Sequence, residues 1–181
     1  MPQPRTEWTL DMVHALPEDG NRYELIDGEL LVSPSPSPQH QRVLGRLFEV
    51  VSRYVEALGG YETFFAPAAI TFSARRELQP DLLVLPLLDD GRPAERFEEV
   101  RCLLLAVEVL SPSNSRNDRY KKRTVYQQQG VPEYWIVDPD ARLVERWRPG
   151  DSEPEVLIDQ LAWQPSPERP PLVINLTRVL A

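Results

Sequence analysis

The feature that most constrains this chain is a glutamate inside an apolar strand. Residues 103–110 read LLLAVEVL, and a continuous apolar run of this length is typical of a strand that is covered on both faces. Glu108 lies within that run. An unpaired buried carboxylate destabilises a protein by roughly several kcal/mol even after relaxation. The sequence therefore predicts a metal ion, a cation or a proton beside Glu108.

Two nearby residues are candidates for that neighbourhood. Asp81 follows Pro80 and starts the preceding apolar run, and Lys122 lies on the helix expected over residues 114–129. At about 100° per residue, Lys122 is at the centre of the helix face that should pack on the sheet. The face consists of Asp118, Lys122, Val125, Tyr126 and Gln129. The alternative is a lysine whose stem follows the core and whose amine reaches water.

The remaining pattern predicts one α/β (α+β) domain over residues 1–181, with a mixed sheet and packed helices. Expected helices cover residues 10–16, a long segment from Pro38 to Gly59-Gly60, and 114–129, with Thr9, Ser37, Asn114 and Ser115 as caps. Expected strands are a hairpin around Asp27-Gly28, then 61–65, 68–72, 82–88, 103–110 and 133–139, a hairpin of 141–147 with 155–158, and 171–181. A loop is expected before Pro171.

Composition narrows the function classes. The net charge of −8 argues against nonspecific coating of nucleic acid, although five cationic residues between positions 116 and 123 form either a solvated helix face or a phosphate-facing patch. The single cysteine, Cys102, is expected to be a small buried hydrophobe in a reducing compartment. No apolar stretch is long enough for a membrane span, so we expect a cytoplasmic protein that does not bind membranes. His14 and His40 are expected to be structural.

Two carboxylates on neighbouring strands with a nearby lysine form the residue set of the PD-(D/E)XK nucleases. Such carboxylates can hold Mg²⁺, which keeps several waters and bridges to a substrate phosphate. Longer strings add specificity, namely YELIDGELL, SPSPSPQHQRVLGRL, QPDLLVL and AVEVLSPSNSRNDRYKKRTVYQQQGVPEYWIVDP. In this order they resemble the bacterial Uma-two family, a domain of unknown function described as a candidate restriction endonuclease. The resemblance covers about residues 23–147.

This resemblance implies a restriction-endonuclease-like fold in which Asp81 and Glu108 bind Mg²⁺ or Mn²⁺. It also implies DNA as the substrate and a homodimer. The usual motif has a lysine two positions after the glutamate, where this sequence has Leu110, and the family pattern instead matches Lys122 on the following helix. Glu24 matches an auxiliary ligand or water organiser. From the residues alone Glu24 is equally an ordinary strand glutamate.

Two hypotheses of different classes follow. The first is a metal-dependent DNA endonuclease in which Asp81, Glu108, Lys122 and Glu24 form the catalytic site. The second is a nuclease-fold module without catalysis, which acts in binding or assembly. In the second case Glu108 and Lys122 form a buried ion pair, and Asp81 is a turn residue. Binding of Mg²⁺ or Mn²⁺ would distinguish them. An RNA or small-molecule hydrolase on the same scaffold cannot be separated from the first by sequence.

Overall fold

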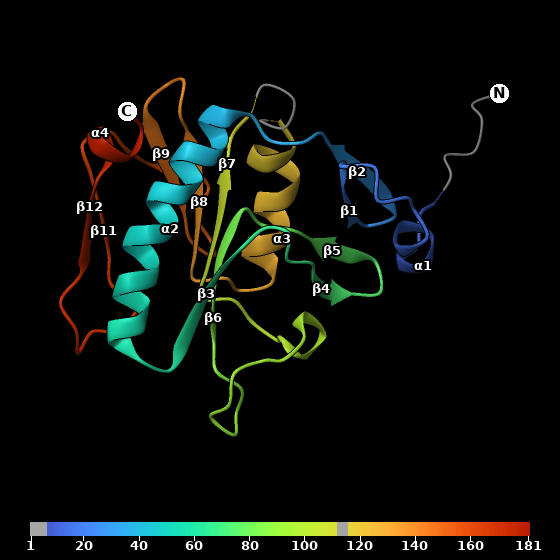
Figure 1. Cartoon of the computed structure of the whole chain (residues 1–181), viewed down its shortest axis with the longest axis horizontal. Helices are drawn as coiled ribbons and strands as arrows, with labels where there is room; N and C mark the ends of the chain where they lie inside the picture. The colour runs from blue at the N-terminus through green and yellow to red at the C-terminus, as the bar shows by residue number, and fades with distance from the viewer. Residues whose placement is uncertain (1–6, 112–115) are drawn as a thin grey trace.

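The computed structural model describes residues 7–111 and 116–181. Its centre is a six-stranded mixed sheet with strand order β10-β9-β8-β7-β6-β3 (Figure 1). The strands of this central sheet are β3 (Tyr61–Phe65), β6 (Leu82–Pro86), β7 (Leu105–Val109), β8 (Glu133–Asp138), β9 (Leu143–Trp147) and β10 (Glu155–Leu157). The pair β7–β8 is parallel and the other pairs are antiparallel. The expected mixed sheet with packed helices is confirmed.

One face of the central sheet is covered by the long helix α2 (Pro38–Leu58), as Figure 1 shows. The Ser37 side chain accepts a hydrogen bond from the backbone N–H of His40, and Pro38 occupies the first turn, where its missing N–H costs nothing. The apolar stripe of α2 packs on the sheet residues that alternate toward it, such as Leu105 and Val107. The helix ends at Gly59, whose φ of 70° suits glycine.

The same face also carries the C-terminal part of the chain. Here β11 (Gln160–Trp163) pairs with β12 (Leu172–Asn175), and α4 (Leu176–Val179) follows. Two expectations were wrong in this region. The stretch before Pro171 contains β11, whose Leu161 and Trp163 alternate into the core. Residues 171–181 turn from strand to helix because the Asn175 side chain accepts a hydrogen bond from the Arg178 N–H and caps α4.

The opposite face of the central sheet packs on a second sheet of order β2-β1-β5-β4 and on the helix after β7. The strands of this second sheet are β1 (Arg22–Ile26), β2 (Glu29–Ser33), β4 (Ile70–Ser73) and β5 (Arg76–Leu78). The β1–β2 turn has positive φ at both Asp27 and Gly28, which confirms the predicted hairpin. Strand β5 was not predicted, because three residues are too few for a visible alternation.

The helix after β7 differs from its prediction. Positions 114 and 115, its expected caps, lie outside the described residues. The segment η2 (Asn117–Lys122) is a π-helix that continues into α3 (Arg123–Gln128). π-helical turns are rare in proteins, and those that do occur are frequently found at functional sites. The remaining short helices are α1 (Leu10–His14), capped by Thr9 as expected, and η1 (Phe97–Glu99).

Two further findings concern chain-wide expectations. Cys102 is exposed and not a buried hydrophobe, because β7 begins only at Leu105 and Cys102 lies in the irregular segment before it. Within residues 7–111 and 116–181, no helix combines the length and apolar character that a membrane span requires.

Candidate active site

The two predicted metal ligands lie opposite each other on one face of the central sheet. The β6–β7 register pairs Leu82 with Val107 and Leu83 with Ala106, and one more step places Asp81 across from Glu108. The backbone N–H of Val109 donates to Asp81 Oδ2 at 2.8 Å, which fixes this carboxylate at the strand end. Both side chains are buried. The register thus places Asp81 and Glu108 next to each other, and their role as metal ligands stays a prediction.

Lys122 reaches this face from η2 and is surrounded by carboxylates. Its Nζ lies 2.8 Å from Glu24 Oε2, 3.0 Å from Glu108 Oε1 and 3.2 Å from Asp118 Oδ1. Only 1% of the lysine side chain is exposed, so its amine does not reach water as the alternative interpretation required. Glu24 comes from β1, where its Oε1 accepts a hydrogen bond from the Gln79 N–H at 2.8 Å. Glu24 is therefore part of the buried cluster.

Asp81 is held by two further groups that sequence reasoning did not assign to the site. Arg22 Nη1 donates to Asp81 Oδ1 at 2.6 Å and to the Gln79 carbonyl at 3.0 Å. His40 Nε2 lies 2.9 Å from Asp81 Oδ2. Arg22 Nη2 also approaches Glu108 Oε2, at 3.9 Å. Arg22 therefore lies between the two predicted metal ligands, and the structural role expected for His40 consists of holding one of them.

The acids of the cluster outnumber its cations. Four buried carboxylates, Glu24, Asp81, Glu108 and Asp118, share Arg22 and Lys122, which leaves an excess of two negative charges if all four ionise. A buried excess of this kind is unfavourable unless protons or a further cation neutralise it.

Burial and neighbouring charges shift the pKa values of these acids in different directions. Burial would raise the pKa of Asp81, but the hydrogen bond from His40 and the charge of Arg22 outweigh it and lower this pKa to about 2. Burial raises the pKa of Glu108 well above its usual range, despite the opposing charge of Lys122. Burial likewise raises the pKa of Asp118 to about 6. The lysine pKa is raised, because its three carboxylate neighbours outweigh burial.

The donor set fits a hard divalent cation. Glu108 Oε2 is buried and has no hydrogen-bond partner, and Arg22 Nη2 lies 3.9 Å from it. A divalent cation would also match the excess of two negative charges. Within the described ranges, no three His, Cys, Asp or Glu side chains converge to hold a metal ion. Mg²⁺ accepts such a site, because it is commonly bound by one or two carboxylates together with waters and substrate phosphates.

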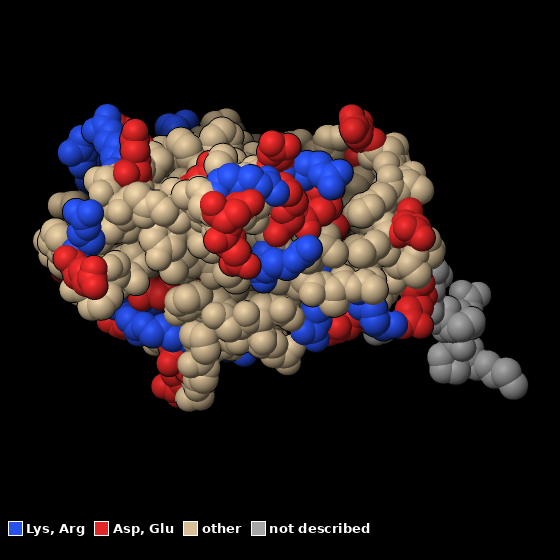
Figure 2. Space-filling view, turned by 90° about the horizontal axis from the view of Figure 1, so that it is seen from below, with Lys and Arg blue, Asp and Glu red and all other residues tan. Residues whose placement is uncertain are grey.

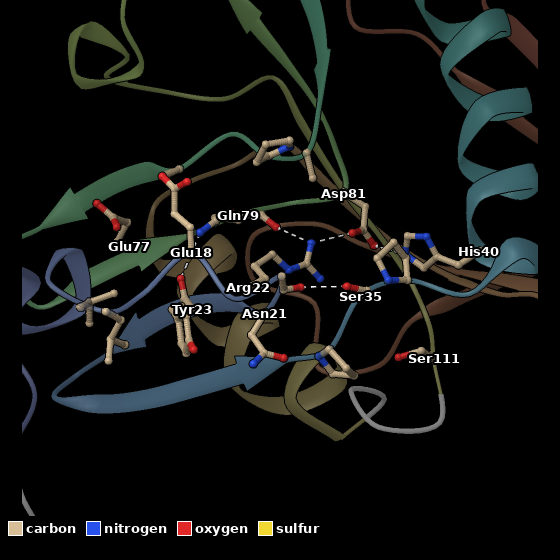
Figure 3. A pocket seen from close by; sticks show the side chains of 18 of the residues that line it. Glu18, Asn21, Arg22, Tyr23, Ser35, His40, Glu77, Gln79, Asp81 and Ser111 are labelled. Carbon is tan, nitrogen blue, oxygen red and sulfur yellow. Dashed lines mark hydrogen bonds and ion pairs between the residues drawn. The ribbon is translucent and has the colours of Figure 1, made fainter.

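A cavity of about 740 Å³ opens beside these residues. Figure 3 shows Asp81, Arg22 and His40 on one side of it, with Gln79 and then Glu77 farther along the wall. Ser35, Asn21 and Tyr23 also line the cavity, as do several proline rings. Asp81 and Arg22 therefore border the cavity, whereas Glu24, Glu108 and Lys122 do not line it.

Several cations of the basic run from Arg116 to Arg123 are paired with carboxylates of the chain. Arg119 is paired with Asp138 at 2.9 Å and with Glu145 at 2.7 Å, and Lys121 is paired with Glu29 at 2.6 Å. Figure 2 shows acidic and basic groups intermixed on one face of the molecule. Arg119, Lys121 and the buried Lys122 are thus paired with carboxylates within the chain, which leaves less free positive charge here than the sequence suggested.

Three site residues could have been identified from the sequence pattern. Asp118 shares the predicted inward helix face with Lys122, one turn earlier. Arg22 lies two residues before Glu24 on the same strand, and the period of two places both side chains on one face. His40 precedes Val43, Leu44 and Leu47 by three, four and seven positions, which places it on the buried stripe of α2.

Comparisons with known proteins agree with this architecture. A solved structure described as a "putative nuclease belonging to DUF820" from Anabaena variabilis superposes with a TM-score of 0.76 and 24% sequence identity. The match covers 96% of this chain and 97% of that chain, and it establishes a shared fold. A search of curated proteins found no match. The model of the Uma2 family, described as "Putative restriction endonuclease", matches residues 10–177. The chain therefore belongs to the Uma2 family, as its sequence strings indicated.

Proposed function

We propose that this protein is a divalent-metal-dependent endonuclease that hydrolyses phosphodiester bonds in DNA. The observation that carries the proposal is the pair of buried carboxylates, Asp81 and Glu108, opposite each other in the strand register. Asp81 lines a cavity, and Glu108 Oε2 has no hydrogen-bond partner. The description of the Uma2 family as "Putative restriction endonuclease" and that of the structural neighbour as a "putative nuclease" support the same reaction class. The implied homodimer and the cytoplasmic location remain predictions.

In this proposal Asp81 and Glu108 hold Mg²⁺ or Mn²⁺. The bound cation supplies a polarised phosphoryl oxygen and a water of lowered pKa. The chain's own residues prepare the site. Lys122 holds the Oε1 atom of Glu108, which leaves Glu108 Oε2 without a hydrogen-bond partner. Glu24 stabilises the lysine, and its second oxygen is fixed by the backbone of Gln79.

The position of Lys122 refines its predicted role. With three carboxylates within 3.2 Å and 1% of its side chain exposed, its ammonium is already fully engaged. We therefore assign it as a positioning residue that fixes Glu108 and Glu24. A role for Lys122 in which it contacts the attacking water would require the ammonium to leave this cluster.

The test is cleavage of supercoiled and linear DNA by purified protein with Mg²⁺ or Mn²⁺, compared with Asp81→Asn. The wild type should nick or cut DNA, and the variant should lose the activity by at least 100-fold, because one of two cation-holding carboxylates is lost. Asp90→Asn is a matched control, since Asp90 is an exposed loop residue paired with Arg92. Equal cleavage by wild type and Asp81→Asn would refute the assignment.

A second function is favoured by one specific observation. Arg22 and Lys122 already contact the carboxylates, which is the arrangement expected of a nuclease-fold module that binds partners without catalysis. Titration calorimetry with millimolar Mn²⁺ distinguishes the two functions, because only the metal-dependent enzyme should show binding that Asp81→Asn removes. Absence of heat and of cleavage in the wild type would favour the non-catalytic module.

A further inference from the structure

The guanidinium of Arg22 lies near three carboxylates of the candidate site, whereas a simple ion pair involves only one. Its Nη1 lies 2.6 Å from Asp81 Oδ1, its Nη2 lies 3.9 Å from Glu108 Oε2, and its Nε lies 3.9 Å from Glu24 Oε2. One guanidinium therefore faces three carboxylates. Of the three carboxylates, only Asp81 is within hydrogen-bond distance, and the Gln79 carbonyl at 3.0 Å also accepts from Nη1.

We propose that Arg22 is an internal counter-ion for Asp81 and Glu108, and that a divalent cation binds these carboxylates in competition with it. The inference rests on the proposed function, because it concerns the same pair of acids. A guanidinium and a divalent cation at this position would repel each other strongly in an environment that is poor in water. The guanidinium must therefore withdraw from Asp81 as the cation binds.

The surroundings of Arg22 permit such a withdrawal. Arg22 is the first residue of β1, its side chain is 18% exposed, and it borders the cavity. Figure 3 shows the guanidinium between Gln79 and Asp81 at the edge of this open space. Lys122, by contrast, is 1% exposed and is held by three acids. Of the two cations in the cluster, Arg22 is the one with room to move.

Withdrawal toward the cavity also gives the guanidinium a second role. A planar guanidinium suits bidentate contacts with phosphate, and the cavity is where a substrate phosphate next to Asp81 would lie. The same side chain would thus keep the acids neutralised before the metal binds and contact the substrate afterwards.

The experiment is calorimetric titration of Mn²⁺ into wild type, Arg22→Gln and Arg22→Lys at one pH and ionic strength. Arg22→Gln should bind Mn²⁺ at least tenfold more tightly than the wild type, because the competing charge is gone. Arg22→Lys keeps a charge, and its affinity should remain within about threefold of the wild type. Arg76→Gln is the matched control, since Arg76 pairs with Asp27 outside the cluster, and its affinity should be unchanged.

A second measurement uses the wild-type protein, so it does not depend on the folding of Arg22→Gln. The Nε–H resonance of Arg22 in the ¹⁵N-labelled protein is assigned by its absence in Arg22→Lys. Saturation with Mg²⁺ should shift this resonance and speed its exchange with water. An unchanged resonance at saturation would overturn the inference.

The outcomes separate the inference from the proposed function. If the wild type binds Mn²⁺ and Arg22→Gln binds it equally or more weakly, competition by Arg22 is refuted, but the proposal of a metal-dependent nuclease is not. No Mn²⁺ binding by the wild type or by either Arg22 variant refutes both.

Discussion

Replacing Lys122 with methionine tests the central electrostatic claim. The substitution keeps most of the buried volume and removes one positive charge that lies within 3.2 Å of three carboxylates. Removing one partner of a buried ion pair costs about 3–5 kcal/mol of folding free energy, because the remaining charge is left uncompensated. For a domain of this size, that loss corresponds to a melting temperature lower by about 6–20 °C.

The pH dependence of this loss is part of the prediction. The pKa of Asp118 is about 6 and that of Glu108 is raised well above its usual range, so protons can replace the missing ammonium at low pH. Lys122→Met should therefore lose less stability at pH 5 than at pH 7.5. Adding Glu108→Gln removes one of the uncompensated acids and should recover at least about 1 kcal/mol at pH 7.5.

Urea unfolding followed by circular dichroism at both pH values supplies the free energies. The control is Lys121→Met, since Lys121 is the neighbouring residue and pairs with Glu29 on the exposed surface. Its loss should be below about 1 kcal/mol. If Lys122→Met loses less than about 1 kcal/mol at pH 7.5 with an unchanged m-value, or loses the same amount at both pH values, the reasoning about the cluster is wrong.

Three other predictions concern pH, metal and helix capping. Burial raises the pKa of Asp118 to about 6, so the protonated carboxyl favours the folded state below about pH 4, and this contribution is lost as the pH rises through 6. In urea unfolding, the stability of Asp118→Asn relative to the wild type should therefore increase by up to about 3 kcal/mol between pH 4 and pH 7.5. Mn²⁺ at 100 times its dissociation constant should stabilise the wild type by about 2.7 kcal/mol in a thermal melt, and EDTA should reverse this, whereas a comparable rise in Asp81→Asn would contradict the ligand assignment. Ser37→Ala should cost about 1 kcal/mol because the His40 N–H loses its cap, and Ser52→Ala on the same helix, whose hydroxyl donates to the Glu49 carbonyl, should cost clearly less in the same melt.

The sequence by itself determined the parts of this protein that depend on local pattern. The apolar run around Glu108, the helix face of Lys122 and the capped helix after Ser37 each follow from the periodicity of side chains along one element. Elements too short to show a repeated pattern of apolar and polar side chains were not predicted. Strand β5 has three residues, and α4 depends on the single cap at Asn175.

Only the tertiary structure decided which charges meet. Arg22, Asp81 and His40 come from a strand, a strand end and a helix that are far apart in sequence, and strand pairing and helix packing bring them together. The sequence showed that Glu108 needs a compensating charge, but pairing distances depend on register and packing, which periodicity does not specify. The physical reason is that the energetic cost of burying a charge can be inferred for a single residue from its apolar sequence neighbours. Which opposite charge compensates it depends on distances between side chains of different elements.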